Sequence, residues 1–241
     1  MSTDRRKDRP TRPLASARPA QARSIFLLLL AAASCDPAGA QTSIAATIAS
    51  EYSLRGLSLS DARAVPQLRI DHDTAGGAYA GLFASRVFLR ASEAQASVIA
   101  YGGYARRLVS GFGWDAGVSR SIFVHDARYD YTEVYAGISS DSASARLSLS
   151  PDYYGAGRTA YIEVNAFQPL GERLRISGHA GVLRWFAGQG AAARERADLR
   201  VALGTDIGDA SIEVGLQARQ RDPGLRAPRA RALFASASMG F

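Results

Sequence analysis

Residues 49–85 read A-S-E-Y-S-L-R-G-L-S-L-S-D-A-R-A-V-P-Q-L-R-I-D-H-D-T-A-G-G-A-Y-A-G-L-F-A-S, and the rest of the chain repeats the pattern found here. Apolar and polar residues alternate over residues 44–55, again over 66–71 and again over 79–85. A side-chain period of two is typical of a β-strand with one apolar and one polar face. A polar segment at 56–63 and the pair Gly76-Gly77 separate the three runs. The stretch therefore predicts three antiparallel strands joined by a loop and a tight turn.

The alternation returns nine more times, at 95–107, 114–119, 131–139, 144–150, 160–167, 173–182, 198–203, 211–217 and 229–241. Long polar connections (56–63, 124–130, 151–158, 186–196 and 220–228) alternate with short ones (72–77, 109–111, 140–142, 168–172 and 206–209). The connection at 90–94 is short where a long one is expected. An even strand number and long loops alternating with short turns are features of bacterial outer-membrane barrels. The sequence predicts an all-β fold, an antiparallel transmembrane β-barrel of about 12 strands.

The polar face of these strands carries charges that a soluble barrel would place outside. The opposite face is rich in Ala, Val, Ile and Leu, which suits contact with lipid, and closure of the barrel leaves no unpaired backbone edge in the membrane. Aromatic residues near the predicted strand ends fit interfacial girdles; they are Tyr52, Tyr79, Tyr104, Trp114, Tyr131, Tyr135, Tyr153, Tyr154, Trp185 and Phe241. A soluble periplasmic β-sandwich with tyrosines in its core is the alternative.

Residues 1–40 differ in kind from the rest. A basic segment precedes the apolar run from Ile25 to Ala33, and Ala38-Gly39-Ala40 is an A-x-A cleavage site. This pattern predicts a secretory signal peptide at 1–40 and a barrel at 41–241, located in the cell outer membrane of a Gram-negative bacterium. Cleavage before Cys35, as in a lipoprotein, is the alternative. The chain has 29 basic and 22 acidic residues, of which the signal holds seven and three, so the mature net charge falls from +7 to +3. No nucleic-acid partner is expected.

The opening stretch resembles a known family. Ser50, Tyr52, Arg55, Gly56, Ser58, Ser60 and Asp61, followed by Gly77, Tyr79 and Gly81, match the S-x-Y-x-x-R-G-x-S-x-S-D and G-x-Y-x-G signatures of the TorF-type porin family of proteobacteria, a conserved hypothetical family. The resemblance continues through Glu133-Val-Tyr135-Ala-Gly137 and Asp152-Tyr-Tyr154-Gly155. It implies an outer-membrane barrel but no defined transported substrate.

The polar face supplies the candidate functional residues. The predicted pore-lining residues are Glu51, Arg55, Arg69, Asp71, Glu133, Arg146, Glu163, Arg175, Asp198, Arg200 and Glu213. A twelve-stranded barrel lies between barrels filled by side chains and those with an aqueous channel. We therefore expect a narrow lumen for passive diffusion of small polar solutes or ions, with no cofactor. If the charges pair and fill the lumen, the protein is instead a structural barrel without a pore.

Two further features bear on function. Ser177 and His179 share a strand face, as in outer-membrane lipid hydrolases, but that face also carries Arg173 and Arg175 and is predicted to face the lumen. We therefore predict no enzyme and no catalytic residue, and keep the hydrolase as an alternative. His72, His125 and His179 are not spaced as metal ligands. Phe241 closes the last predicted strand and resembles the signal read by the barrel-insertion machinery.

Overall fold

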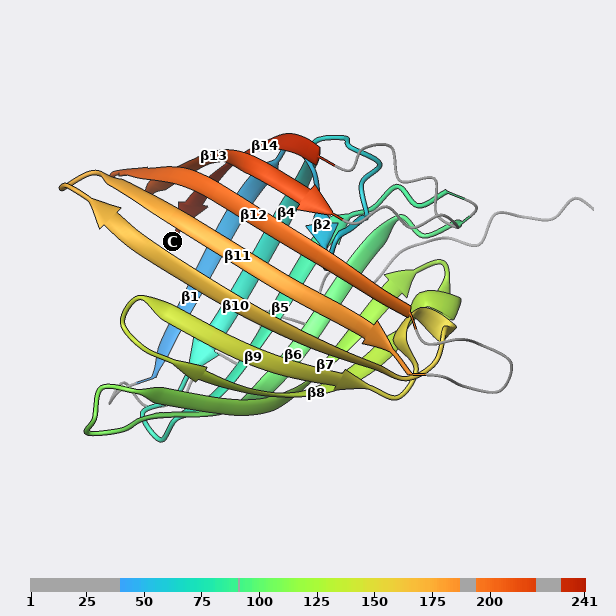
Figure 1. Ribbon diagram of the computed structural model, residues 1–241, viewed down its shortest axis with the longest axis horizontal. Coiled ribbons are helices and arrows are strands. Elements are labelled where there is room, and N and C mark those ends of the chain that lie inside the picture. The colour runs from blue at the N-terminus through green and yellow to red at the C-terminus, as the bar shows by residue number, and fades with distance from the viewer. Residues whose placement is uncertain (1–39, 91, 187–193, 220–230) are drawn as a thin grey trace, which may run out of the picture. The chain divides into compact units, whose positions relative to one another are not determined.

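The computed structural model describes residues 40–90, 92–186, 194–219 and 231–241, and twelve of its strands close into an antiparallel barrel (Figure 1). The barrel strands are β1 (Gln41–Ala49), β4 (Val65–Asp73), β5 (Ala78–Arg86), β6 (Ala96–Arg107), β7 (Gly113–Val124), β8 (Tyr131–Ser139), β9 (Ala143–Ser150), β10 (Thr159–Leu170), β11 (Leu174–Trp185), β12 (Arg194–Ile207), β13 (Ala210–Arg219) and β14 (Arg231–Gly240). The predicted fold class and strand number are confirmed. The predicted signal peptide and Cys35 lie outside the described residues.

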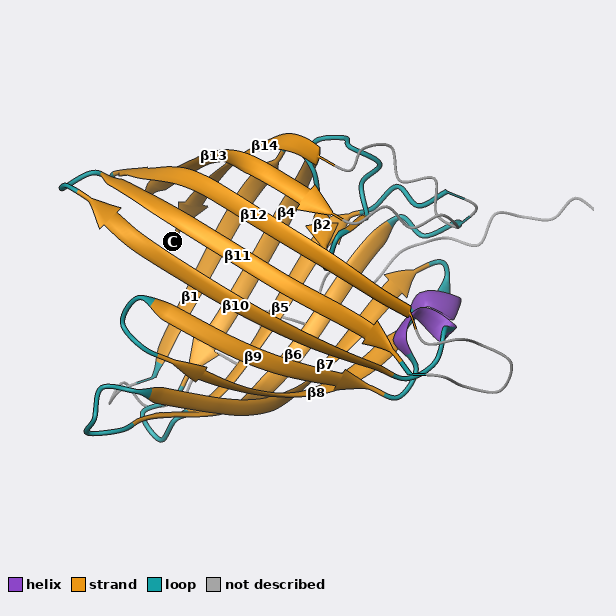
Figure 2. Ribbon diagram, in the orientation of Figure 1, coloured by secondary structure: helices purple, strands orange, loops and turns teal. Residues whose placement is uncertain are grey.

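Closure is made by β1, which pairs with β14 on one side and with β4 on the other. The remaining elements are short: the strands β2 (Ser53–Leu54) and β3 (Leu57–Ser58) and the 3-10 turns η1 (Ala127–Tyr129) and η2 (Tyr153–Gly155). Strands dominate the described chain, and both 3-10 turns lie at the same end of the barrel (Figure 2). Among the described residues, no helix is both long enough and apolar enough to cross a membrane.

Apolar side chains point outward and polar side chains point inward along the strands. Val134 is 55% exposed, while its neighbour Glu133 is 5% exposed. The same contrast recurs around the barrel, where Ile48, Ile162 and Leu216 are more than half exposed. This arrangement is the reverse of a water-soluble barrel and matches the lipid-facing band of a membrane barrel.

The connections sort to two ends of the barrel. Residues 50–64, 87–95, 125–130 and 151–158 link strands at one end, which we call the long-loop end (right in Figure 1). Turns such as 140–142 and 171–173 link them at the other, the short-turn end. The connection between β5 and β6 covers residues 87–95, so the sequence estimate of 90–94 was too short and the alternation of lengths is unbroken.

The predicted aromatic girdles are only partly present. Tyr104, Trp114 and Phe241 are exposed on the outside, with the Tyr104 and Trp114 rings 5.9 Å apart, all at the short-turn end. The prediction was wrong for Tyr52, Tyr131, Tyr153 and Trp185, which are buried inside the barrel, and for Tyr154, which packs against them. It was also wrong for Tyr79 and Tyr135, whose hydroxyls hydrogen-bond to each other on the inner wall. For the strand residues the reason is parity, because Tyr131 lies two residues from inward-facing Glu133 and shares its face. Tyr52, Tyr153 and Tyr154 lie in connections instead.

Several inward tyrosines lie flat on glycines of neighbouring strands. A Cβ at Gly81 would come 2.5 Å from the Tyr101 ring, and one at Gly181 would come 2.1 Å from the Tyr161 hydroxyl. These distances are below van der Waals contact, so only glycine permits the close approach. The rings therefore lie along the wall and leave space in the lumen.

Candidate functional site

The first long connection turns into the barrel and forms a small hairpin. β1 ends at Ala49, six residues before the predicted strand end, and the chain continues into β2 and β3. The two residues between them, Arg55 and Gly56, have φ of 49° and 73°. Positive φ at both central positions is the requirement of a type I′ hairpin turn. At the hairpin base, the Tyr52 N–H donates to Ser60 Oγ at 2.9 Å and the Leu59 N–H donates to the Tyr52 carbonyl at 2.8 Å.

The hairpin tip reaches the far wall of the barrel. The Arg55 guanidinium makes a two-pronged ion pair with Glu133 of β8, in which Nη2 lies 2.8 Å from Oε2. It also lies 4.4 Å from the ring centre of Tyr161 on β10. A Cβ at Gly56 would approach Asp198 Cβ of β12 to 3.3 Å. The Arg55 and Glu133 side chains are 10% and 7% exposed, so removing one partner leaves a buried charge, which typically costs about 3–5 kcal/mol.

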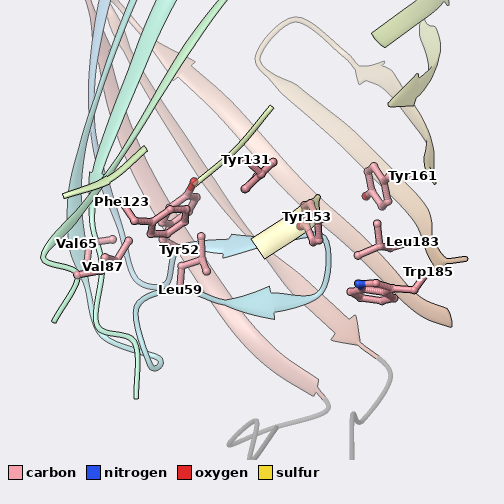
Figure 3. Packing of buried hydrophobic residues seen from close by; sticks show 11 residues of the cluster. Tyr52, Leu59, Val65, Val87, Phe123, Tyr131, Tyr153, Tyr161, Leu183 and Trp185 are labelled. Carbon is pink, nitrogen blue, oxygen red and sulfur yellow. The ribbon is translucent and has the colours of Figure 1, made fainter. Parts of the chain in front are cut away.

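Aromatic side chains fill the space around the hairpin. The cluster contains Tyr52, Leu59, Val65, Val87, Ala94, Phe123, Tyr131, Tyr153, Tyr161, Leu183 and Trp185. In Figure 3 the hairpin runs from the group around Tyr52 and Leu59 toward Tyr153. Burial raises the pKa of the Tyr153 phenol, which therefore stays neutral at physiological pH. We call the hairpin and this cluster the plug; it packs the lumen at the long-loop end.

Beneath the plug lies a polar cavity of about 620 Å³. The hairpin residues from Ser53 to Gly56 form part of its lining, and β9 to β13 supply most of the rest. The charged or ionisable residues of the lining are Arg55, Tyr161, Glu163, His179, Asp198, Arg200, Glu213 and Arg219. The interior thus has a dry half and a half with space for a polar solute.

The predicted pore-lining residues share the inner face, with two differences in position. Arg55 is on the hairpin tip instead of a strand wall, and Glu51 lies two residues beyond the end of β1. The register places Glu163 opposite Arg146 on β9, and Asp198 opposite Arg219 on β13. These positions do not test a role in permeation, so the assignment of the eleven residues as pore-lining remains a prediction.

Most of these charges pair with an opposite charge. Glu51 pairs with Arg219 at 3.2 Å, Arg146 with Asp115 at 2.8 Å, Arg175 with Asp206 at 2.6 Å, and Arg200 with Glu213. The Tyr101 hydroxyl donates to Asp71, and the Arg69 guanidinium lies 5.7 Å from the Phe83 ring centre. The sequence reasoning missed Asp115, Asp206 and Arg219 as partners. All three were detectable, since each lies an even number of residues from an inward residue on its strand.

His179 lies in the cavity among acceptors. Its Nε2 is 2.7 Å from Asp198 Oδ1, and its Nδ1 is 2.7 Å from Asn165 Oδ1. Ser177 lines the same cavity, but in the described part of the chain it makes no hydrogen bond to His179. A nucleophilic serine needs a free imidazole nitrogen as its base, and here both nitrogens have other partners. No three His, Cys, Asp or Glu side chains of the described residues are grouped to hold a metal ion.

Comparison with known proteins gives one family and a set of similar folds. The family model described as "Bacterial protein of unknown function (Gcw_chp)" matches residues 33–218. No curated protein matches the chain. The solved structure of the KdgM porin in complex with disordered oligogalacturonate is similar with a TM-score of 0.54 and 13% identity, over 83% of this chain and 99% of that one. The outer membrane protein opdK from Pseudomonas aeruginosa matches with a TM-score of 0.33 and 12% identity, over 80% and 68%. At these identities the likeness to KdgM concerns the fold alone.

Proposed function

The chain belongs to the Gcw_chp family of bacterial proteins of unknown function, and we propose that it is an outer-membrane channel for passive diffusion of small polar solutes or ions. The observation that carries the proposal is the closed twelve-stranded barrel with an apolar outside and a polar cavity of about 620 Å³ inside. Outward-facing apolar residues favour lipid on the outside, and the charged inner wall favours water within.

The proposal includes a route to the membrane. Residues 1–40 would direct export and be removed, leaving 41–241 as the barrel, consistent with the TorF-type resemblance. Phe241 would be read by the insertion machinery. In support, its N–H donates to the Ile44 carbonyl at 2.8 Å and its carbonyl accepts from the Ile44 N–H at 3.2 Å, so it joins the last strand to the first.

Paired charges on the inner wall would set what passes. In channels, rings of charged side chains and the fields between them select among solutes. Arg200 and Glu213 on neighbouring strands, and Arg146 and Asp115 two strands apart, give local fields with little net charge. We therefore propose weak charge selectivity and passage limited by size.

The plug favours a second candidate, a structural barrel without a pore. Tyr153 and Leu59 are fully buried, and the hairpin reaches across the lumen to Glu133, so side chains occupy much of the described long-loop half. A hairpin held in this position would narrow the lumen, so conduction should increase when the hairpin leaves it. The hydrolase alternative has less support, because Ser177 and His179 face the lumen and both His179 nitrogens are engaged.

Planar-bilayer recording of the refolded protein tests the proposal. We expect steps of current whose reversal potential in a salt gradient stays close to zero. Heat-dependent migration on a denaturing gel shows beforehand that the barrel has formed. Silence at every voltage, both for the native chain and for a variant whose hairpin is released, would identify a structural barrel instead.

A further inference from the structure

Two arginines from different segments meet on one phenylalanine at the long-loop end. The Arg63 guanidinium carbon lies 4.7 Å from the Phe88 ring centre, and that of Arg86 lies 5.1 Å from the same centre. Arg63 follows the hairpin, Arg86 is the last residue of β5, and Phe88 lies in the next connection. Both arginines are exposed. The two guanidinium carbons are therefore no more than 9.8 Å apart.

Backbone hydrogen bonds to other segments hold Phe88 in place beneath the two arginines. The Phe88 N–H donates to the Leu59 carbonyl at 2.7 Å, and the Val87 N–H donates to the Gln95 carbonyl at 3.1 Å. Val87 and Leu59 are both buried in the plug. Stacking on Phe88 holds each guanidinium plane without using its hydrogen-bond donors. The pair is thus presented with its N–H groups available.

Neither arginine has a carboxylate partner in the described part of the chain. The third arginine of the group, Arg90, pairs with Asp61 at 3.2 Å, whereas no ion pair is formed by Arg63 or Arg86 there. All three border a surface hollow of about 430 Å³, together with Asp61 and Glu93. Two unneutralised guanidinium groups beside a hollow favour an anion with several acceptor oxygens.

The position of Arg86 indicates where that anion comes from. On β5, Arg86 continues the outward parity of Ala80, Leu82 and Ala84, so it stands on the lipid side of the strand where the apolar band ends. Arginine at this depth meets lipid headgroups. The longer loops of outer-membrane barrels lie on the outer surface, which places the long-loop end in the outer leaflet. There a lipid with phosphate on a sugar headgroup offers the required acceptors, and a guanidinium matches phosphate with paired hydrogen bonds.

We propose that Arg63 and Arg86, stacked on Phe88, bind the phosphate of a phosphorylated glycolipid in the surrounding outer leaflet. This site rests on the outer-membrane location proposed above, and it does not require that the barrel conduct. It would hold one lipid against the end of β5, beside the connection that packs on the hairpin.

The test uses the full refolded chain in detergent and lipopolysaccharide with or without its headgroup phosphates, with bound lipid counted by native mass spectrometry. We expect the phosphorylated form to bind and the dephosphorylated form to bind at least about tenfold more weakly. Arg63→Gln and Arg86→Gln should each weaken binding about tenfold, since hydrogen bonds to charged groups contribute on that scale. Arg107→Gln is the matched control, because Arg107 pairs with Asp141 at the short-turn end and both side chains are exposed.

Three results would overturn the site: equal binding by the double Arg63→Gln/Arg86→Gln variant, equal binding of both lipid forms, or displacement of the lipid by inorganic phosphate at the same concentration. The last result would identify a site for the free anion. Heat-dependent gel migration confirms that each variant has folded. Bilayer recording on the same preparations separates the two proposals, because loss of lipid binding with intact conductance contradicts only the lipid site.

Discussion

The two halves of the lumen are built on the same strands but have opposite contents. At the long-loop end, inward positions carry Tyr131, Phe123 and Trp185, and the hairpin adds Tyr52 and Leu59, so the interior is a dry core. Toward the short-turn end the same strands carry glycine, serine and paired charges, and the interior is a cavity. The difference teaches that backbone alternation fixes which residues face inward, while side-chain size decides whether that interior is a core or a channel.

Removal of the Arg55–Glu133 ion pair should change the difference between the two halves of the lumen more than any other substitution. Glu133→Gln leaves the Arg55 charge buried without a counterion, which should cost about 3–5 kcal/mol in the closed position. The hairpin should then leave the lumen, and unit conductance in a planar bilayer should rise several-fold. Asp141→Asn is the control, since it removes an exposed partner of Arg107. Unchanged conductance in a variant with an unchanged unfolding midpoint would show that this pair does not hold the plug.

The tyrosine–glycine contacts test how the wall supports the plug. Gly181→Ala places a Cβ 2.1 Å from the Tyr161 hydroxyl, so the ring must move, and this ring carries the Arg55 guanidinium. We expect a loss of about 1–3 kcal/mol in the free energy of unfolding, measured by urea titration in detergent. Gly178→Ala on the same strand is the matched control, because nothing lies within 4 Å of its added Cβ. Equal effects of the two substitutions would refute the role of the close contact.

Substitutions in the cavity half should change the ion selectivity of the channel more than its free energy of unfolding. Arg200 and Glu213 form an ion pair with side chains 42% and 21% exposed, for which the contribution to stability is expected to be about 1 kcal/mol or less. Arg200→Gln should make the lumen more cation-selective and Glu213→Gln more anion-selective, seen as reversal potentials of opposite sign in a salt gradient. Shifts of the same sign, or none in a conducting channel, would place the permeation path away from this wall.

The sequence predicted the strands well because period two is a local property. The charges of Glu133 and Glu163 were sufficient to identify the inner faces of β8 and β10. The strand at 131–139 was predicted with its observed bounds. Several aromatic residues were misassigned although the signal was present. Tyr131 and Tyr135 share the parity of Glu133, and Trp185 shares that of Arg175 on β11, so parity should have outweighed their nearness to strand ends.

The hairpin could not be predicted in the same way. Alternation continues through residues 50–55, so the pattern read as a longer first strand. The turn uses Arg55 at positive φ, where asparagine or aspartate before glycine is the usual signal. What holds it is Glu133, 78 residues away, and such a contact leaves no periodic trace in the sequence. The S-x-Y-x-x-R-G-x-S-x-S-D motif now has a structural reading, with Ser60 tying the hairpin base and Arg55 its tip.

The smallest expected effect concerns the loops that border the plug. Hydrogen bonds from Arg128 and Ser92 hold the pKa of Asp126 well below its usual range and tie two connections together. Because the pKa of Asp126 is depressed in the folded state, the contribution of this tie to stability is complete above the unfolded pKa of about 4. It is lost as the pH falls through the folded pKa. Acid should therefore loosen these loops only at low pH, as the pH falls through the folded-state pKa of Asp126. After correction for the intrinsic pH dependence of amide exchange, hydrogen exchange of residues 92–130 should rise only at low pH in the native chain. Asp126→Asn should show the raised exchange already at neutral pH. If Asp126→Asn instead retains the native pH profile, the tie does not restrain the long-loop end, and the plug is closed by the hairpin contacts alone.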